Sequence, residues 1–136
     1  MTQVILIVAV LSICDVEESL DPNLKFEIQR TWSEEGSVEG LTPVDGKSWQ
    51  LVQVNVTNQN RETSVELLPW YFFAYTDTGE RIWAFNSDEG AFDPIDPGHN
   101  STVILIFDIP GGSSLTELEY IKRTSSPVRC VVPQAE

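Results

Sequence analysis

The stretch that decides the fold is Trp49–Thr57, WQLVQVNVT, in which apolar and polar side chains alternate. In an extended chain, Val52 and Val54 share one side, and Gln53 and Asn55 share the other. This period of two predicts a β-strand with one face buried in a core and the opposite face polar or covered separately.

Short apolar runs of the same kind recur along the chain between turn residues. They are Leu24–Trp32, Val65–Thr76, Arg81–Phe85, Thr102–Ile109, Leu115–Lys122 and Val128–Val132. A tight turn is expected at Asp96-Pro97-Gly98, because proline presets φ and glycine accepts a positive φ. The spacing predicts an all-β, immunoglobulin-like β-sandwich of two antiparallel sheets with about seven to nine strands.

The chain is strongly acidic. Its 136 residues include eight Lys and Arg and 21 Asp and Glu, which gives a net charge of −13. Such a surface repels nucleic acid and anionic membranes, because both are bound through Lys and Arg. The acids are spread along the sequence, which favours a role in solubility or salt adaptation.

The N-terminal segment, residues 1–14, is treated apart from the sandwich at residues 15–136. It contains the apolar run Val4–Ile13, which is too short to span a bilayer as a helix. One interpretation of the run is the apolar part of a signal peptide, although no Lys or Arg precedes it. Another is a fully buried β-strand. The sequence before Cys14 is similar to a lipoprotein cleavage box and leaves a lipid anchor as an alternative, although Ile13 departs from the expected small residue.

A further interpretation is that this run is donated as an extended strand into the sheet of a neighbouring copy. Its alternate side chains Val4, Leu6, Val8 and Val10 would then occupy pockets in the neighbour. Head-to-tail donation does not close on itself, so it would produce filaments.

Cys14 and Cys130 are the two cysteines, one near each end of the chain. Their separation fits neither a zinc knuckle nor a redox pair. They form either a disulfide, which indicates an oxidising compartment, or two unrelated buried thiols.

The middle of the chain resembles a known family. The matching segments, in order, are Trp49–Asn60, Phe72–Gly79, Ile95–Gly98, Phe107–Pro110, and Leu118 with Tyr120. Over residues 24–123 they are similar to the secreted immunoglobulin-like domains of the DUF4352 type, related to the mycobacterial secreted antigen MPT63. The resemblance implies an extracellular or envelope-anchored module with no assigned activity.

Catalytic residues, cofactors and a built metal site are not expected. His99 is the single histidine and follows Asp-Pro-Gly, so it is interpreted as an exposed turn residue rather than a general base. Calcium ligands are conceivable in the acidic loop that contains Asp88, Glu89, Asp93 and Asp96, but the spacing is not that of an EF-hand.

Two other features point to the surface. Asn55-Val56-Thr57 and Asn100-Ser101-Thr102 are glycosylation sequons, with Asn55 and Asn100 as acceptors. Alternation also places apolar side chains on the faces turned away from the core, namely Tyr71, Phe73, Tyr75, Ile104 and Ile106. Such faces are covered either by the chain's own loops or by a partner protein.

We therefore expect a non-catalytic extracytoplasmic module for binding or structural assembly at the cell surface. The alternative is a self-assembling subunit of an extracellular filament, and a small hydrolase comes third. A protein partner or self-assembly is expected, without nucleic acid and without a bilayer-spanning helix in the mature chain.

Overall fold

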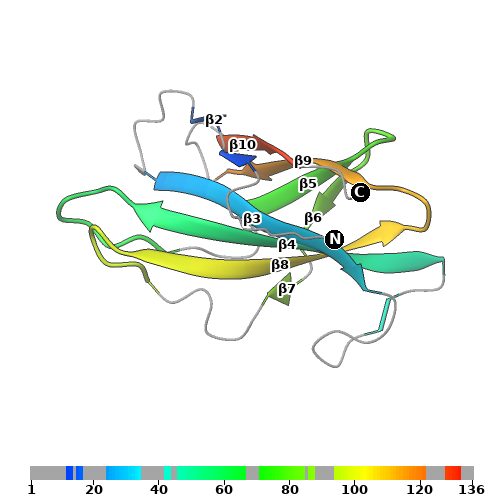
Figure 1. The fold of residues 1–136 in the computed structure, drawn as a ribbon, viewed down its shortest axis with the longest axis horizontal. Helices are drawn as coiled ribbons and strands as arrows, with labels where there is room; N and C mark the ends of the chain where they lie inside the picture. Colours follow the sequence, from blue (N-terminus) through cyan, green and yellow to red (C-terminus); the bar gives the residue numbers. More distant parts are fainter. Residues whose placement is uncertain are drawn as a thin grey trace, which may run out of the picture.

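The structure is a computed structural model that describes residues 12–13, 15–16, 24–34, 42–43, 46–66, 71–84, 86–87, 94–121 and 128–132. These residues form ten strands arranged in two antiparallel sheets. The sheets lie face to face as the two layers of a β-sandwich (Figure 1). The all-β sandwich expected from the alternating sequence is therefore confirmed.

Each sheet has five strands. Sheet A has, in spatial order, β1 (Ser12–Ile13), β3 (Leu24–Glu34), β4 (Lys47–Asn58), β8 (Asn100–Pro110) and β7 (Asn86–Ser87). Sheet B has β2 (Asp15–Val16), β10 (Val128–Val131), β9 (Leu115–Tyr120), β5 (Phe72–Thr76) and β6 (Arg81–Trp83). Three long strands, β3, β4 and β8, form the centre of sheet A.

The strand count exceeds the expected seven to nine because two segments of the chain contribute to both sheets. β1 pairs with β3 in sheet A, and β2, one residue later, pairs with β10 in sheet B. In the same way β6 ends at Trp83 in sheet B, and β7 begins at Asn86 in sheet A. Each of these two segments looks like a single strand in the sequence, but it passes from one sheet to the other and so forms two short strands.

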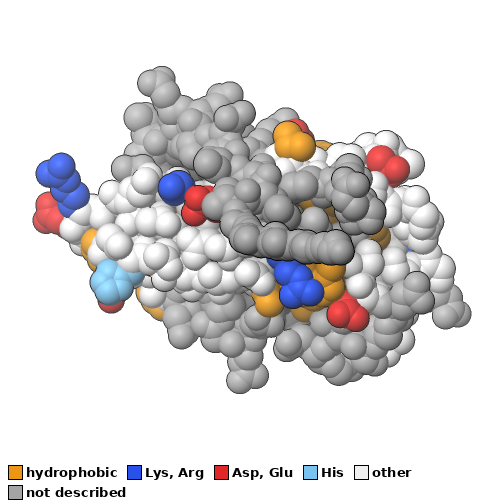
Figure 2. Space-filling view, in the orientation of Figure 1, with side chains coloured by type: hydrophobic (Ala, Val, Ile, Leu, Met, Phe, Trp, Pro, Cys, Tyr) orange, Lys and Arg blue, Asp and Glu red, His pale blue; other side chains and the backbone are white. Residues whose placement is uncertain are grey.

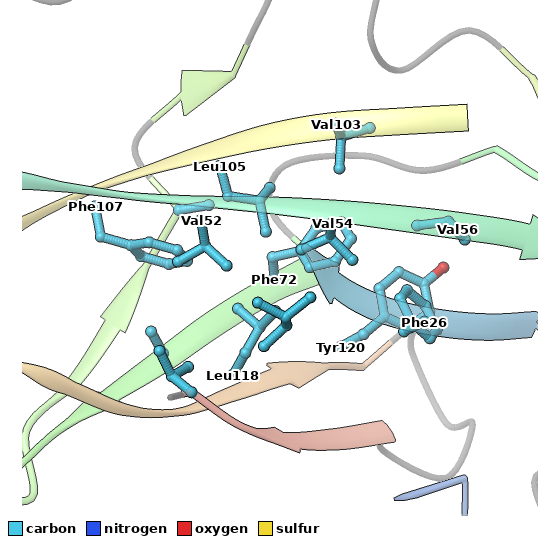
Figure 3. Packing of buried hydrophobic residues seen from close by; sticks show 14 of the residues in the cluster. Phe26, Val52, Val54, Val56, Phe72, Val103, Leu105, Phe107, Leu118 and Tyr120 are labelled. Carbon is cyan, nitrogen blue, oxygen red and sulfur yellow. The ribbon is translucent and has the colours of Figure 1, made fainter. Parts of the chain in front are cut away.

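The main core fills the space between the two sheets. Val52, Val54 and Val56 of β4 are fully buried there, as the alternation predicted. The inward side chains of β8 join them, and these are Val103, Leu105, Phe107 and Ile109. Figure 3 shows Val103, Leu105 and Phe107 pointing toward Phe72 and Leu118 of sheet B.

Aromatic rings join the two sheets at one end of this core. The ring centroid of Tyr120 lies 5.0 Å from that of Phe26 and 5.0 Å from that of Phe72. Phe26 and Phe72 meet edge to face at 6.3 Å. Because Phe26 belongs to sheet A and the other two rings to sheet B, these contacts tie the layers together.

A β-bulge in β3 changes which way its second half faces. Ile28 pairs with Val54, but Arg30 pairs with Gln53, so Gln29 is an extra residue in β3. Simple alternation would put Trp32 on the core side with Ile28. The extra residue reverses the alternation, and Trp32 instead packs on the outer face of sheet A.

The predicted turn at Asp96-Pro97-Gly98 is confirmed. Gly98 has a φ of 79°, and the His99 N–H donates to the Asp96 carbonyl at 3.0 Å. The turn is fastened to the end of β4 by Asn58, whose carbonyl accepts from the Gly98 N–H at 2.9 Å.

The fully buried Asn58 side chain holds two further segments. Its Nδ2 donates to the carbonyls of Thr63 and Ile95, each at 2.8 Å, and its Oδ1 accepts from the Asn60 N–H at 2.9 Å. One buried amide thus satisfies backbone groups from the segment after β4 and from the segment before β8.

Candidate binding surface

The outward side of sheet B carries the candidate site, here called the aromatic face. Its described side chains are Phe73, Tyr75, Arg81, Trp83, Glu117, Glu119 and Val131. Trp83 and Val131 are 66% and 68% exposed, and they are the large exposed hydrophobic residues of the described part of the chain. Both lie on this one face.

Strand register determines how these side chains meet. Phe73 on β5 stands between Trp83 on β6 and Glu119 on β9. In the next row, Tyr75 stands between Arg81 and Glu117. Residues directly or diagonally opposite on the same face are close enough to interact.

Glu119 is the centre of a polar network on this face. Its Oε1 accepts a hydrogen bond from the Tyr75 hydroxyl at 3.1 Å, and Arg81 Nη2 lies 3.2 Å from the same oxygen. Only 4% of the Glu119 side chain is exposed, against 44% for Arg81. A carboxylate this deeply buried needs such partners, because removing it from water is costly.

Arg81 is held on its other side by an aromatic ring. Its guanidinium carbon lies 3.7 Å from the centroid of Phe73, and Trp83 meets Phe73 edge to face at 5.9 Å. The cation is therefore fixed between a ring and a carboxylate. Together these contacts hold the exposed indole of Trp83 beside an ordered polar network.

The outward side of sheet A has an apolar cluster too, but this cluster is buried. Trp49 and Ile106 are each 1% exposed and pack with Leu51, and Trp32 and Ile104 lie partly buried against them. Of the two ways in which Ile104 and Ile106 were expected to be covered, the structure shows the chain itself burying Ile106 and partly burying Ile104.

Tyr71 also departs from the expected arrangement. It precedes β5, packs against the main core and contacts Tyr120 edge to face at 6.0 Å. Phe73 and Tyr75 do lie on the side of β5 away from the core. The aromatic face therefore contains two of the three aromatic residues that alternation suggested.

The N-terminal candidates Val4, Leu6, Val8, Val10 and Cys14 lie outside the described residues. Ser12 and Ile13, at the end of the apolar run, pair with Ile28 and Glu27 of the same chain. The backbone of Cys130 pairs with Leu118 inside sheet B.

Of the four calcium candidates in the acidic loop, only Asp96 lies in the described part of the molecule. Asp96 is exposed and accepts from the Ser64 hydroxyl at 3.3 Å, whereas Asp88, Glu89 and Asp93 lie outside the described residues. Over the described residues, no three His, Cys, Asp or Glu side chains gather as metal ligands. In Figure 2 the red acidic side chains are scattered over the visible face rather than grouped.

The two sequon asparagines lie on sheet A. Asn55 is partly buried in β4, and its Nδ2 donates to the Thr102 hydroxyl of β8 at 3.0 Å. Asn100 is exposed at the start of β8. No helix in the described ranges is long and apolar enough to cross a bilayer.

Five residues of the aromatic face were missed by the sequence reasoning, namely Arg81, Trp83, Glu117, Glu119 and Val131. A signal for the first two was present, because Arg81-Ile82-Trp83 alternates and so puts Arg81 and Trp83 on the same side of a strand. Glu119 had no such signal, since its burial and its partners come from strands distant in the sequence.

No family model and no curated protein matches the sequence. The fold, however, is similar to solved structures. The secreted protein MPT63 of Mycobacterium tuberculosis is 21% identical, with a TM-score of 0.57 over 75% of this chain and 77% of that one. A candidate lipoprotein of Bacillus subtilis, YcdA, is 15% identical, with a TM-score of 0.59 over 85% of this chain but only 38% of its own.

An uncharacterized β-sandwich protein of Clostridium difficile is also similar. It is 14% identical, and the match has a TM-score of 0.52 over 85% of this chain and 87% of that one. At these identities the likeness concerns the fold alone. The chain thus shares the β-sandwich of MPT63 and of two bacterial proteins whose names carry no enzymatic activity.

Proposed function

We propose that this chain is a non-catalytic, extracytoplasmic immunoglobulin-like module of the DUF4352 and MPT63 type, which binds a protein partner at the cell surface. The binding site in this proposal is the aromatic face. An extracellular location is supported by the fold shared with a secreted protein and with a candidate lipoprotein.

The observation that carries the proposal is the 66% exposure of Trp83 beside an Arg81 that is already fixed in place. Trp, Tyr and Arg are the side chains most enriched where binding energy concentrates in protein interfaces. Trp83, Tyr75 and Arg81 lie here on neighbouring strands. Because their geometry is set before binding, little conformational freedom is lost when a partner docks.

The test is retention on washed cell envelopes of the source organism. Wild-type protein is expected to pellet with the envelopes and to saturate, and Trp83→Ala is expected to bind at least about tenfold more weakly. Gln59→Ala, an exposed polar change away from the face, is the control and should bind like wild type. Equal retention of Trp83→Ala and wild type would exclude the aromatic face as the site.

A further inference from the structure

The strand β6 is an open edge of sheet B. Among the strands that the structure describes, β6 is the last of sheet B and pairs with β5 alone. The Thr76 N–H donates to the Glu80 carbonyl at 2.9 Å, and the Ala84 N–H donates to the Phe72 carbonyl at 3.1 Å. Residues 80, 82 and 84 therefore occupy the hydrogen-bonded positions of this antiparallel pair.

It follows that Arg81 and Trp83 occupy the alternate positions, where the backbone N–H and C=O point away from the partner strand. Across the described ranges, no hydrogen bond uses these four backbone groups. They form a short row of donors and acceptors with the spacing that another strand needs.

The side chains do not protect this edge in the usual way. Natural edge strands are often blunted by free charges, by proline or by a bulge. Here the Arg81 charge is engaged by Glu119 and Phe73, and the next outward side chain is the exposed Trp83. The edge is accessible, and it offers an apolar anchor directly beside its free backbone groups.

Charge indicates what kind of strand would dock. Asp77 and Glu80 are exposed in the turn that leads into β6, and Glu117 lies on the aromatic face two strands away, on β9. The whole chain carries −13, so a second copy would be repelled, whereas a cationic segment would be attracted. An exposed indole also favours contact with Lys or Arg.

We propose, building on the proposed function, that β6 docks an extended cationic segment of a partner protein as an additional antiparallel strand. Backbone groups of Arg81 and Trp83 bond to alternate residues of that segment. The side chains of those same residues lie on the aromatic face, and Lys or Arg at these positions contact Trp83 and the neighbouring carboxylates.

The test uses a synthetic ten-residue peptide in which Lys alternates with Val and Thr, with binding measured by fluorescence anisotropy. In the proposed register the bonded residues are the lysines. Methylation of the lysine backbone nitrogens should therefore abolish binding, while methylation at the Val and Thr positions, whose N–H groups point away, should leave it intact. The peptide with Glu in place of Lys should bind at least about tenfold more weakly.

A matched pair of variants tests the protein side. Trp83→Ala and Trp83→Pro both remove the indole, but only proline also removes the N–H that faces the open edge. Neither variant loses a backbone hydrogen bond between β5 and β6, and both lose the same ring contact with Phe73. Both should therefore melt at similar temperatures. The peptide should bind weakly to Trp83→Ala and not at all to Trp83→Pro.

The proposal is overturned if the lysine-methylated peptide binds like the unmodified one, or if the Glu peptide binds as well as the Lys peptide. If envelopes retain the protein through Trp83 and the Lys peptide does not bind, the aromatic face stands as a binding site but strand addition at β6 is wrong. If Trp83 does not affect envelope retention, the proposed function itself fails.

Discussion

The guanidinium of Arg81 lies over the ring of Phe73, with 3.7 Å between the guanidinium carbon and the ring centroid. These residues come from adjacent strands and occupy diagonal positions on the open side of sheet B. The contact orders the side chains around Trp83 without burying them, so its strength can be measured in the folded protein.

A double-mutant cycle with Phe73→Leu and Arg81→Met should give a coupling free energy of about 0.5–1 kcal/mol. The value is small because Arg81 is partly solvated. Urea unfolding of the wild type, the two single variants and the double variant measures it. Strict additivity of the two single changes would show that the stacked geometry contributes nothing to stability.

Glu119→Gln should lower the free energy of unfolding by about 1–2 kcal/mol, since a charged acceptor for Arg81 and Tyr75 becomes neutral. The ion pair with Arg81 contributes only modestly to this free energy, because the Arg81 side chain is nearly half exposed to solvent. Glu117→Gln, on the same strand and less buried, is the control and should have a smaller effect. Equal effects of the two changes, read from urea unfolding, would contradict the central position of Glu119.

Phe72 and Phe73 are adjacent residues of the same type that face opposite ways. Phe72→Ala should destabilise the fold by about 3–5 kcal/mol, because it opens a cavity among fully buried side chains. Phe73→Ala should cost clearly less, because its ring is partly exposed. Thermal or chemical unfolding of the two variants checks the ranking, and a reversed order would mean that β5 is turned over.

Asn58→Ala should destabilise the protein by about 2–3 kcal/mol, because the variant loses the buried amide that donates to the carbonyls of Thr63 and Ile95 and accepts from the Asn60 N–H. Asn60→Ala removes only a less buried neighbour of the same cluster and serves as the control. Urea unfolding measures both variants. If Asn58→Ala lowers the free energy of unfolding no more than Asn60→Ala does, the buried amide does not stabilise these segments.

The register of β2 with β10 bears on the cysteines. Val16 pairs with Val128, and Asp15 pairs with Arg129. Asp15 and Arg129 are the chain neighbours of Cys14 and Cys130, so the register pairs the residues next to the two cysteines. We propose that the two cysteines form a disulfide.

Alkylation of the native protein should then label neither cysteine until a reductant is added. Reduction should lower stability, by roughly 4–5 kcal/mol on the chain-entropy model for so long a loop. Labelling of both thiols without a reductant would refute the bond. Cys14→Ser with Cys130→Ser is the control variant, whose stability should not respond to reductant.

The sequence by itself determined the class of the fold and the inward faces of its long strands. Val52, Val54 and Val56 on β4, and the inward side chains of β8, follow from an alternation that is visible within nine residues. The turn at Pro97 and Gly98 was equally local, because it depends on the φ preferences of those two residues. Such features need no knowledge of which strands become neighbours.

The tertiary structure alone decided which outward apolar cluster is open. Trp49 with Ile106, and Phe73 with Trp83, have the same alternating signature in the sequence, yet the first pair is buried and Trp83 is exposed. The bulge at Gln29, the burial of Glu119 and the free edge of β6 were likewise absent from the local pattern. Alternation fixes the side of a strand on which a residue lies, whereas coverage depends on segments that are distant in the sequence and meet only in the folded chain.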